Sequence, residues 1–210
     1  MAKQLVAKLK LCVLISGRGS NLQSLMDACA QANYPAEIAL VVSNIDGVQG
    51  LERARNAGIE TAVVSHKDFD GREAFDAALT EHIAAYHVDL LCLAGFMRIL
   101  SDDFVNRWRD RLINIHPSLL PAYKGLHVHE RVIEAGEQFS GCTVHFVRPD
   151  MDSGPIIGQA KVAVQAGDDA GTLAARVLEQ EHIIYPEAVR LIAKGRVRIE
   201  DEQVLIEDVT

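Results

Sequence analysis

Short apolar runs alternate with amphipathic segments over residues 11–116, and this alternation constrains the fold more than any other feature of the sequence. Five runs are typical of buried strands: Leu11–Ile15, Ile38–Val42, Thr61–Val64, Leu90–Leu93 and Leu112–His116. Four intervening segments are expected to be helical: Asn21–Ala32, Gly47–Gly58, Arg72–Tyr86 and Asp103–Trp108. Strands that alternate with helices favour a parallel sheet covered on both faces. We therefore predict an α/β protein with a doubly wound, mostly parallel sheet.

The order of elements changes after Pro121. Two further strands, Thr143–Val147 and Ile156–Val164, are joined through turn residues, so we expect them to be antiparallel. A helix is expected from about Ala170 to Ile184, broken at Pro186, followed by short strands near 197–199 and 204–206. Residues 1–8 read as a frayed extension. A length of 210 residues suits a single domain over residues 1–210.

The strand Leu112–His116 carries two polar side chains that point to chemistry. Asn114 and His116 are two residues apart, so both lie on the same face of the strand. Pro117 cannot donate to a sheet ladder and ends the strand directly after the histidine. Ligands of open α/β sheets bind at the carboxyl ends of strands. We expect a site at this position rather than a polar strand end that merely bonds to nearby backbone.

A glycine-rich turn, residues 16–21, joins the first strand to the first helix. Its glycines allow a sharp turn close to a ligand, and Ser20 and Asn21 are expected to cap the helix. The amino end of that helix favours an anion. The turn matches neither the Walker A nor the GxGxxG pattern. Taken alone, it is as compatible with a plain structural turn as with a phosphate site.

Charge and cysteine usage exclude several classes of protein. The formal net charge is -8, which argues against a surface that binds nucleic acid by neutralising phosphates. The four cysteines show no CxxC spacing, and a reducing cytoplasm fits them best. The apolar run at Leu9–Ile15 is too short to span a membrane, so we expect no membrane association.

Histidines near the middle of the chain raise the question of a metal site. His127 and His129 are expected in a loop before a helix over Glu130–Ala135, with His116 and His145 not far off in sequence. Neither an HExxH motif nor a carboxylate at a matching offset accompanies them. We therefore predict no metal.

Asp152 lies in the turn between the two later strands. An aspartate in such a turn is ordinarily a backbone cap. If the fold returns it to His116, its carboxylate would orient the ring, favour the imidazolium and hold a proton acceptor near the chemistry.

Five segments together resemble the phosphoribosylglycinamide formyltransferase family of folate-dependent enzymes: ISGRGSNLQSL, LAGFMRIL, LINIHPSLLPAYKGLHVH, TVHFV and MDSGPII. The resemblance runs in one order from about Leu11 to Lys194. It implies a Rossmann-like formyltransferase fold, with a phosphate-binding half of about residues 1–100 and a folate and catalytic half of about 101–210. It also implies transfer of a formyl group from 10-formyltetrahydrofolate to the amine of glycinamide ribonucleotide, a step of purine synthesis.

The resemblance assigns roles to individual residues. Asn114, His116 and Asp152 match the family's catalytic triad. Substrate-binding positions are matched by Gly19, Ser20, Asn21 and Glu181. Folate-binding positions are matched by Arg72, Met97, Arg98, Ile99, Leu100, Val147, Asp150 and Met151. Ser153 stands where relatives frequently carry glycine.

The chemistry follows from these residues. An oxyanion develops on the formyl oxygen as the amine attacks, and the Asn114 amide and a protonated His116 can each donate to it. Asp152 keeps His116 charged and oriented.

Two other functions stay open. A formyltetrahydrofolate deformylase would use the same residues to pass the formyl group to water, and a non-catalytic nucleotide- or metal-binding module would use none of them for chemistry. We expect small-molecule partners only, a cytoplasmic location, and a monomer or homodimer.

Overall fold

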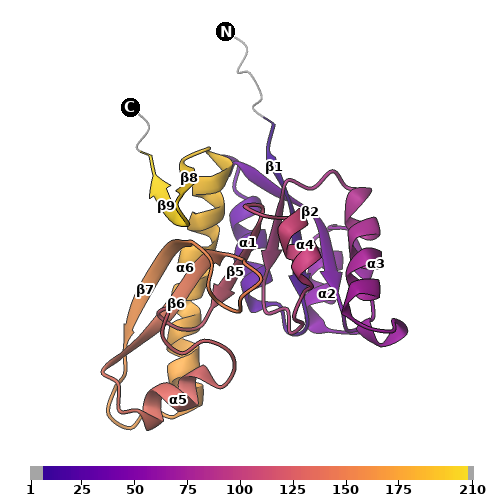
Figure 1. Cartoon of the computed structure of the whole chain (residues 1–210). Helices are drawn as coiled ribbons and strands as arrows, with labels where there is room; N and C mark the ends of the chain where they lie inside the picture. Colours follow the sequence, from indigo (N-terminus) through magenta and orange to yellow (C-terminus); the bar gives the residue numbers. More distant parts are fainter. Residues whose placement is uncertain (1–6, 208–210) are drawn as a thin grey trace.

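A seven-stranded sheet with the strand order β3-β2-β1-β4-β5-β6-β7 organises the protein (Figure 1). The computed structural model describes residues 7–207, so residues 1–6 of the expected N-terminal extension lie outside the described part. The strands of this sheet are β1 (Leu9–Ile15), β2 (Ala36–Ser43), β3 (Thr61–Val63), β4 (Leu90–Leu93), β5 (Leu112–His116), β6 (Phe139–Phe146) and β7 (Ile156–Ala163). β1 to β5 are parallel, whereas β6 and β7 are antiparallel to their neighbours. The predicted mostly parallel, doubly wound sheet is confirmed.

Two apolar cores lie on the two faces of the sheet. The helices are α1 (Ser20–Cys29), α2 (Gln49–Asn56), α3 (Arg72–Ala84), α4 (Asp102–Arg107), α5 (Val128–Glu134) and α6 (Ala170–Ala193). Alternate residues of β1 belong to different cores. Leu11 and Val13 are in the core that includes α1, α2, α5 and α6, and Cys12 and Leu14 are in the core that includes α3 and α4. Each strand of the centre is therefore apolar on both sides, as expected for a covered parallel sheet.

The strand order changes direction between the parallel strands β1 and β4, which are neighbours in the sheet. From β1 the chain proceeds outward through β2 and β3, and then crosses to β4 and β5 on the other side. The amide of Ser16, just after β1, donates to the carbonyl of Gly95, just after β4, over 3.1 Å. The glycine-rich turn and the segment after β4 therefore meet at the topological switch point, where ligands bind in this class of sheet.

α6 contradicts the expected break at Pro186, because the helix continues without interruption to Ala193. Proline removes one backbone hydrogen bond and crowds the preceding turn, which costs roughly 3 kcal/mol in an isolated helix. Here the residues around it are held from outside the helix. The Tyr34 hydroxyl donates to the Pro186 carbonyl over 2.7 Å, and the Tyr185 hydroxyl donates to the Leu93 carbonyl over 3.0 Å. Burial of this part of α6 against the sheet therefore outweighs the helix-breaking tendency of Pro186.

Other expected boundaries shift by a few residues. α5 begins at Val128, so His129 lies within the helix and not in the preceding loop. A short 3-10 helix, His66–Asp68, was not expected. The last two strands, β8 (Val197–Glu200) and β9 (Gln203–Ile206), form a separate antiparallel hairpin beside the end of α6 (Figure 1).

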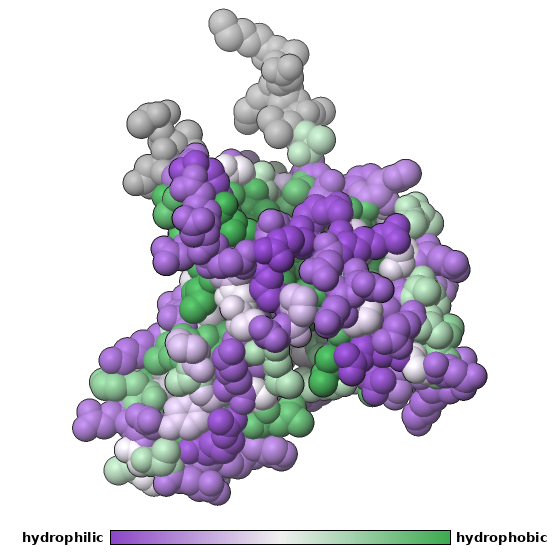
Figure 2. All heavy atoms as spheres, in the orientation of Figure 1, coloured by the Kyte–Doolittle hydropathy of each residue, from purple (hydrophilic) through white to green (hydrophobic). Residues whose placement is uncertain are grey.

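Hydrophilic side chains cover most of the face in Figure 2, and hydrophobic ones form small separate patches. Within residues 7–207, no helix is both long and apolar enough to cross a membrane.

The turn before α1 depends on Gly19. Its φ of 70° lies in the left-handed region, and a Cβ atom there would stand 2.8 Å from the Cα of Gly50. Neither Ser20 nor Asn21 is the N-cap, contrary to expectation; Gly19 is, and it supplies no side-chain hydrogen bond. The helix begins one residue earlier than predicted because the left-handed glycine allows the turn to be tighter.

We predict that Gly19→Ala lowers the free energy of unfolding by about 1–3 kcal/mol, the usual range for a non-glycine residue held at positive φ. The matched control is Gly17→Ala, where an added Cβ meets no atom within 4 Å. Urea unfolding of both variants measures the difference. Equal stability of the two variants would contradict the steric account.

Candidate active site

Asn114 and His116 lie at the carboxyl end of β5, as predicted. The pairing of β5 with β4 sets Asn114 beside Leu93, and the pairing with β6 sets it opposite His145. His116 is 6% exposed and is paired with Thr143 of β6. Because side chains alternate along a strand, Asn114, His116, Thr143 and His145 share one face of the sheet.

The fold returns Asp152 to His116. Asp152 Oδ2 lies 3.5 Å from His116 Nδ1, and its side chain is 11% exposed. The same oxygen accepts a hydrogen bond of 2.9 Å from the Gly125 amide. Asp152 has a φ of 49°, a left-handed conformation that costs about 1–3 kcal/mol in a non-glycine residue. Its neighbours must therefore hold it in place.

Both ring nitrogens of His116 face oxygen atoms that can only accept hydrogen bonds. Nε2 lies 3.0 Å from the Tyr123 carbonyl, and Nδ1 faces the Asp152 carboxylate. Only the imidazolium carries a hydrogen on both nitrogens, so this arrangement suits the charged ring. Tyr123 itself has a φ of 54°, which turns its carbonyl toward the histidine.

His145, which the sequence suggested only as a possible metal ligand, joins this cluster. Its Nδ1 donates to the Phe146 carbonyl over 2.9 Å, which leaves Nε2 as an acceptor for Asn114 Nδ2 at 3.3 Å. Burial lowers the pKa of His145, although Asp152 opposes this effect from 3.9 Å. We take the ring as neutral, since 3.9 Å is too long for a hydrogen bond and the Asn114 amide needs an acceptor. Cross-strand register, had it been known, would have identified this pair.

The predicted substrate-binding residues also meet. Asn21 Nδ2 of α1 donates to Glu181 Oε2 of α6 over 2.6 Å, across 160 positions of sequence. Both side chains are buried, and Asn21 Oδ1 has no partner among the described residues. Burial raises the pKa of Glu181, and the Asn21 hydrogen bond partly opposes this. Gly19 and Ser20 lie directly before Asn21 in the turn.

Seven of the eight predicted folate residues lie on two segments, 97–100 after β4 and 147–151 after β6. Met97 and Ile99 are exposed apolar side chains, whereas Leu100 is buried in the same core that Val147 packs against. The Ser16 hydroxyl accepts from the Met97 amide over 2.8 Å and so fixes this segment to the end of β1. Arg98, Asp150 and Met151 are exposed.

Arg72 opens α3 one turn before Asp76. Asp76 Oδ2 accepts from the Ser101 amide over 2.6 Å, which places this face of the helix against the residue that follows Leu100. The role of Arg72 toward folate stays a prediction.

The other histidines do not form a metal cluster. Across residues 7–207, no group of three or more histidine, cysteine, aspartate or glutamate side chains could hold a metal ion. His127 is exposed at the start of α5, and the pKa of His129 is lowered by its burial.

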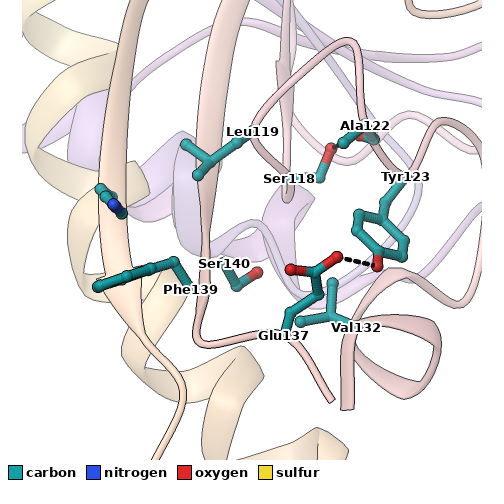
Figure 3. Close-up of a pocket in the computed structure, with 9 residues that line it drawn as sticks. Ser118, Leu119, Ala122, Tyr123, Val132, Glu137, Phe139 and Ser140 are labelled. Carbon is teal, nitrogen blue, oxygen red and sulfur yellow. Dashed lines mark hydrogen bonds between the residues drawn. The ribbon is translucent and has the colours of Figure 1, made fainter. Parts of the chain in front are cut away.

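A cavity of about 250 Å³ is lined by the segment after His116, through Ser118 and Tyr123, and by the start of β6 (Figure 3). None of the predicted site residues lines it. The Tyr123 hydroxyl points into it and donates to Glu137 Oε1 over 2.8 Å, while the Tyr123 carbonyl faces His116. The cavity is thus separated from the cluster by the 117–123 segment.

Comparisons with known proteins agree on one family. A model of the formyl transferase family matches residues 9–189. Phosphoribosylglycinamide formyltransferase of Escherichia coli strain K12 is 48% identical over 193 residues, covering 92% of this chain and 91% of that protein. This chain belongs to the phosphoribosylglycinamide formyltransferase family.

Solved structures of the family have the same fold. Glycinamide ribonucleotide transformylase 1 of Symbiobacterium toebii superimposes with a TM-score of 0.93 at 47% identity, covering 96% of this chain and 95% of that one. Formyltetrahydrofolate deformylase of Burkholderia mallei also superimposes, with a TM-score of 0.87 at 26% identity, over 96% of this chain and 71% of that one.

Longer relatives contain a matching segment. The trifunctional purine biosynthetic protein adenosine-3 of Drosophila pseudoobscura pseudoobscura is 56% identical over 192 residues, which are 90% of this chain. The match spans 14% of that relative's length.

The buried carboxylate of Glu181 gives a prediction about stability and pH. A carboxyl group whose pKa is raised on folding binds its proton more tightly in the folded state, so stability falls as pH rises from the unfolded value of 4.5 to the folded value. Glu181→Gln removes this loss. We expect the variant to be more stable than the original by on the order of 1 kcal/mol at neutral pH, and the gain to vanish below about pH 4.5.

Urea unfolding between pH 4 and 8 measures this difference. Glu187→Gln is the matched control, since Glu187 lies on the same helix with a side chain 49% exposed. A pH-independent difference for Glu181→Gln would show that its carboxylate is not destabilised by burial.

Proposed function

We propose that the protein transfers the formyl group of 10-formyltetrahydrofolate to the amine of glycinamide ribonucleotide. The observation that carries this proposal is the meeting of Asn114, His116 and Asp152 at the carboxyl end of β5. Each residue type suits acyl transfer: an amide donor, a cationic ring and a carboxylate within reach of that ring. Family membership supplies the substrate class.

The reaction forms one carbon–nitrogen bond and breaks another. The substrate amine attacks the formyl carbon, and negative charge develops on the formyl oxygen. One hydrogen of Asn114 Nδ2 is held by His145 Nε2, which fixes the amide plane and leaves the second hydrogen for the oxyanion. The amine then loses a proton, which Asp152 can accept, and the folate nitrogen gains one as it leaves.

In this proposal His116 acts mainly through its positive charge, and only secondarily as a hydrogen-bond donor. Its Nε2 hydrogen is held by the Tyr123 carbonyl, so donation to the oxyanion requires this hydrogen to be shared or released. The His116 side chain is only 7% exposed. A positive charge on its buried ring would therefore stabilise a nearby anion more strongly than the same charge in water. Asp152 keeps the ring in that state.

The substrate positions would follow the residues that the family resemblance assigns. The phosphate would meet Gly19, Ser20 and the first free amides of α1, while Glu181 and the unpartnered Asn21 Oδ1 would receive hydroxyl groups of the ribose. Arg72, Met97, Arg98, Ile99, Leu100, Val147, Asp150 and Met151 would contact the folate. A phosphate-binding half before about residue 100 and a folate and catalytic half after it form a single domain in this proposal.

The compartment and assembly stay predictions. All four cysteines are unpaired thiols in the described residues, which favours a reducing cytoplasm. We expect a monomer or a homodimer.

Deformylation is the second candidate, because a deformylase structure superimposes on 96% of this chain. The two reactions differ only in the acceptor of the formyl group. An assay with both substrates, followed by mass spectrometry, separates them. We expect formylation of the amine to exceed hydrolysis of the donor by on the order of a hundredfold or more. Donor hydrolysis that is unaffected by the amine substrate would favour deformylase.

We predict that His116 and Asp152 act as one unit. Asp152→Asn keeps an acceptor for the Gly125 amide but removes the charge beside the ring. It should lower kcat by on the order of a hundred- to ten-thousandfold, the size of acid–base effects. The double variant with His116→Ala should be little worse than the worse single variant, since groups that act together lose their contribution once.

Circular dichroism of each variant controls for unfolding. Losses that multiply in the double variant would mean that the two residues contribute independently.

A further inference from the structure

Arg148 is a buried cation whose side chain is only 8% exposed, just after the end of β6. Its Nε donates to Glu202 Oε2 over 2.6 Å, and its Nη2 donates to Asp110 Oδ1 over 2.7 Å. Asp110 lies between α4 and β5, and Glu202 lies in the turn between β8 and β9. Arg148 thus ties three separate parts of the chain together. We call Asp110, Arg148 and Glu202 the Arg148 clamp.

The segment that follows Arg148 carries Asp152. Its two ends are joined by a bond of 2.9 Å from the Phe146 amide to the Pro155 carbonyl. Gly154 packs so closely that a Cβ atom there would stand 1.7 Å from the Phe146 carbonyl oxygen. Inside the segment, the Ser153 hydroxyl donates to the Asp150 carbonyl over 2.7 Å. The Arg148 clamp adds an attachment to elements outside the segment.

Glu202 occupies an unfavourable turn position. The hairpin turn places Asp201 and Glu202 at φ values of 48° and 58°, where asparagine and glycine are the preferred residues. A glycine at the second position would make a better turn. Glutamate at this position instead supplies a carboxylate that pairs with both Arg148 and Arg109. The Arg148 guanidinium holds the pKa of Glu202 below its usual range.

We propose that Arg148 is a positioning residue, and that the β8–β9 hairpin serves the active site through it. The clamp holds residues 147–152 so that Asp152 stays in its left-handed conformation 3.5 Å from His116 and the folate-binding side chains keep their places. This inference rests on the proposed function for its catalytic consequence, whereas the clamp itself stands on the geometry above.

The guanidinium is suited to this task by its shape. Its planar fork reaches two carboxylates from different elements at once, and its third nitrogen, Nη1, donates to the Val147 carbonyl over 3.2 Å. A lysine ammonium is a point charge on a flexible stem and would not fix three partners in one plane. Displacement of a reacting group by about 1 Å can cost on the order of a hundredfold in rate.

Glu202→Gly separates the positioning role from a merely structural one. Glycine relieves the positive φ, so the hairpin turn is improved while the clamp loses one carboxylate. Arg148→Met removes the whole clamp but keeps the apolar stem. Glu200→Gln is the matched control, because Glu200 lies on the same hairpin and pairs with Arg198 instead.

Hydrogen exchange of residues 147–155 and steady-state kinetics are measured for each variant, with melting temperature as a check on folding. For Glu202→Gly and Arg148→Met we expect faster exchange in this segment, a kcat lowered and a KM for the folate raised, each by on the order of tenfold, and a KM for the ribonucleotide within about twofold of the original. Glu200→Gln should change none of these.

Two results would overturn the proposal. Unchanged exchange in Glu202→Gly and Arg148→Met would show that the clamp does not hold the segment. Faster exchange with unchanged folate KM and kcat would show that it holds the segment without serving the reaction. Absence of formyl transfer in the unaltered protein would instead overturn the proposed function, and the exchange measurement distinguishes these cases.

Discussion

The antiparallel pairing of β5 with β6 fixes where the polar groups of the candidate site lie. It sets Asn114 opposite His145 and His116 opposite Thr143, so that all four side chains share one face. A shift of the register by one residue would turn one strand's polar residues into the apolar core on the other face. The apolar residues of both strands therefore enforce the arrangement of the polar ones, since Ile113, Val144 and Phe146 are packed in that core.

Polar groups on a buried sheet face need partners, and they find them in the loops at the strand ends. Thr143 Oγ1 donates to the Ser118 carbonyl and accepts from the Leu120 amide and from Gln159. These bonds attach the segment after His116 to β6. They also place Tyr123, whose carbonyl holds the ring of His116. A buried threonine thus fixes the segment whose Tyr123 carbonyl faces His116 Nε2.

Local patterns in the sequence predicted the strands, their mostly parallel order and the pair Asn114 and His116, because alternation and Pro117 are short-range signals. The structure departs from prediction where distant contacts decide. α6 runs through Pro186 because tyrosines at 34 and 185 secure that turn. The pairing of His145 with Asn114 was not predicted because it is set by strand register, and no single strand reveals its register. Gly19 is the helix cap because the left-handed turn beside Gly50 requires it.

The site divides into a part on paired strands and a part on loops. Asn114, His116 and His145 stand on paired strands, and their positions are set by the sheet. Asp152, Tyr123 and Gly125 stand on loops, and Asp152 and Tyr123 have left-handed conformations that the surroundings must maintain. Strain of this kind persists only where several contacts act together. In the proposed function, such a division would keep Asn114 fixed as the oxyanion donor while the loop that carries the Tyr123 carbonyl releases His116 Nε2 to an incoming substrate.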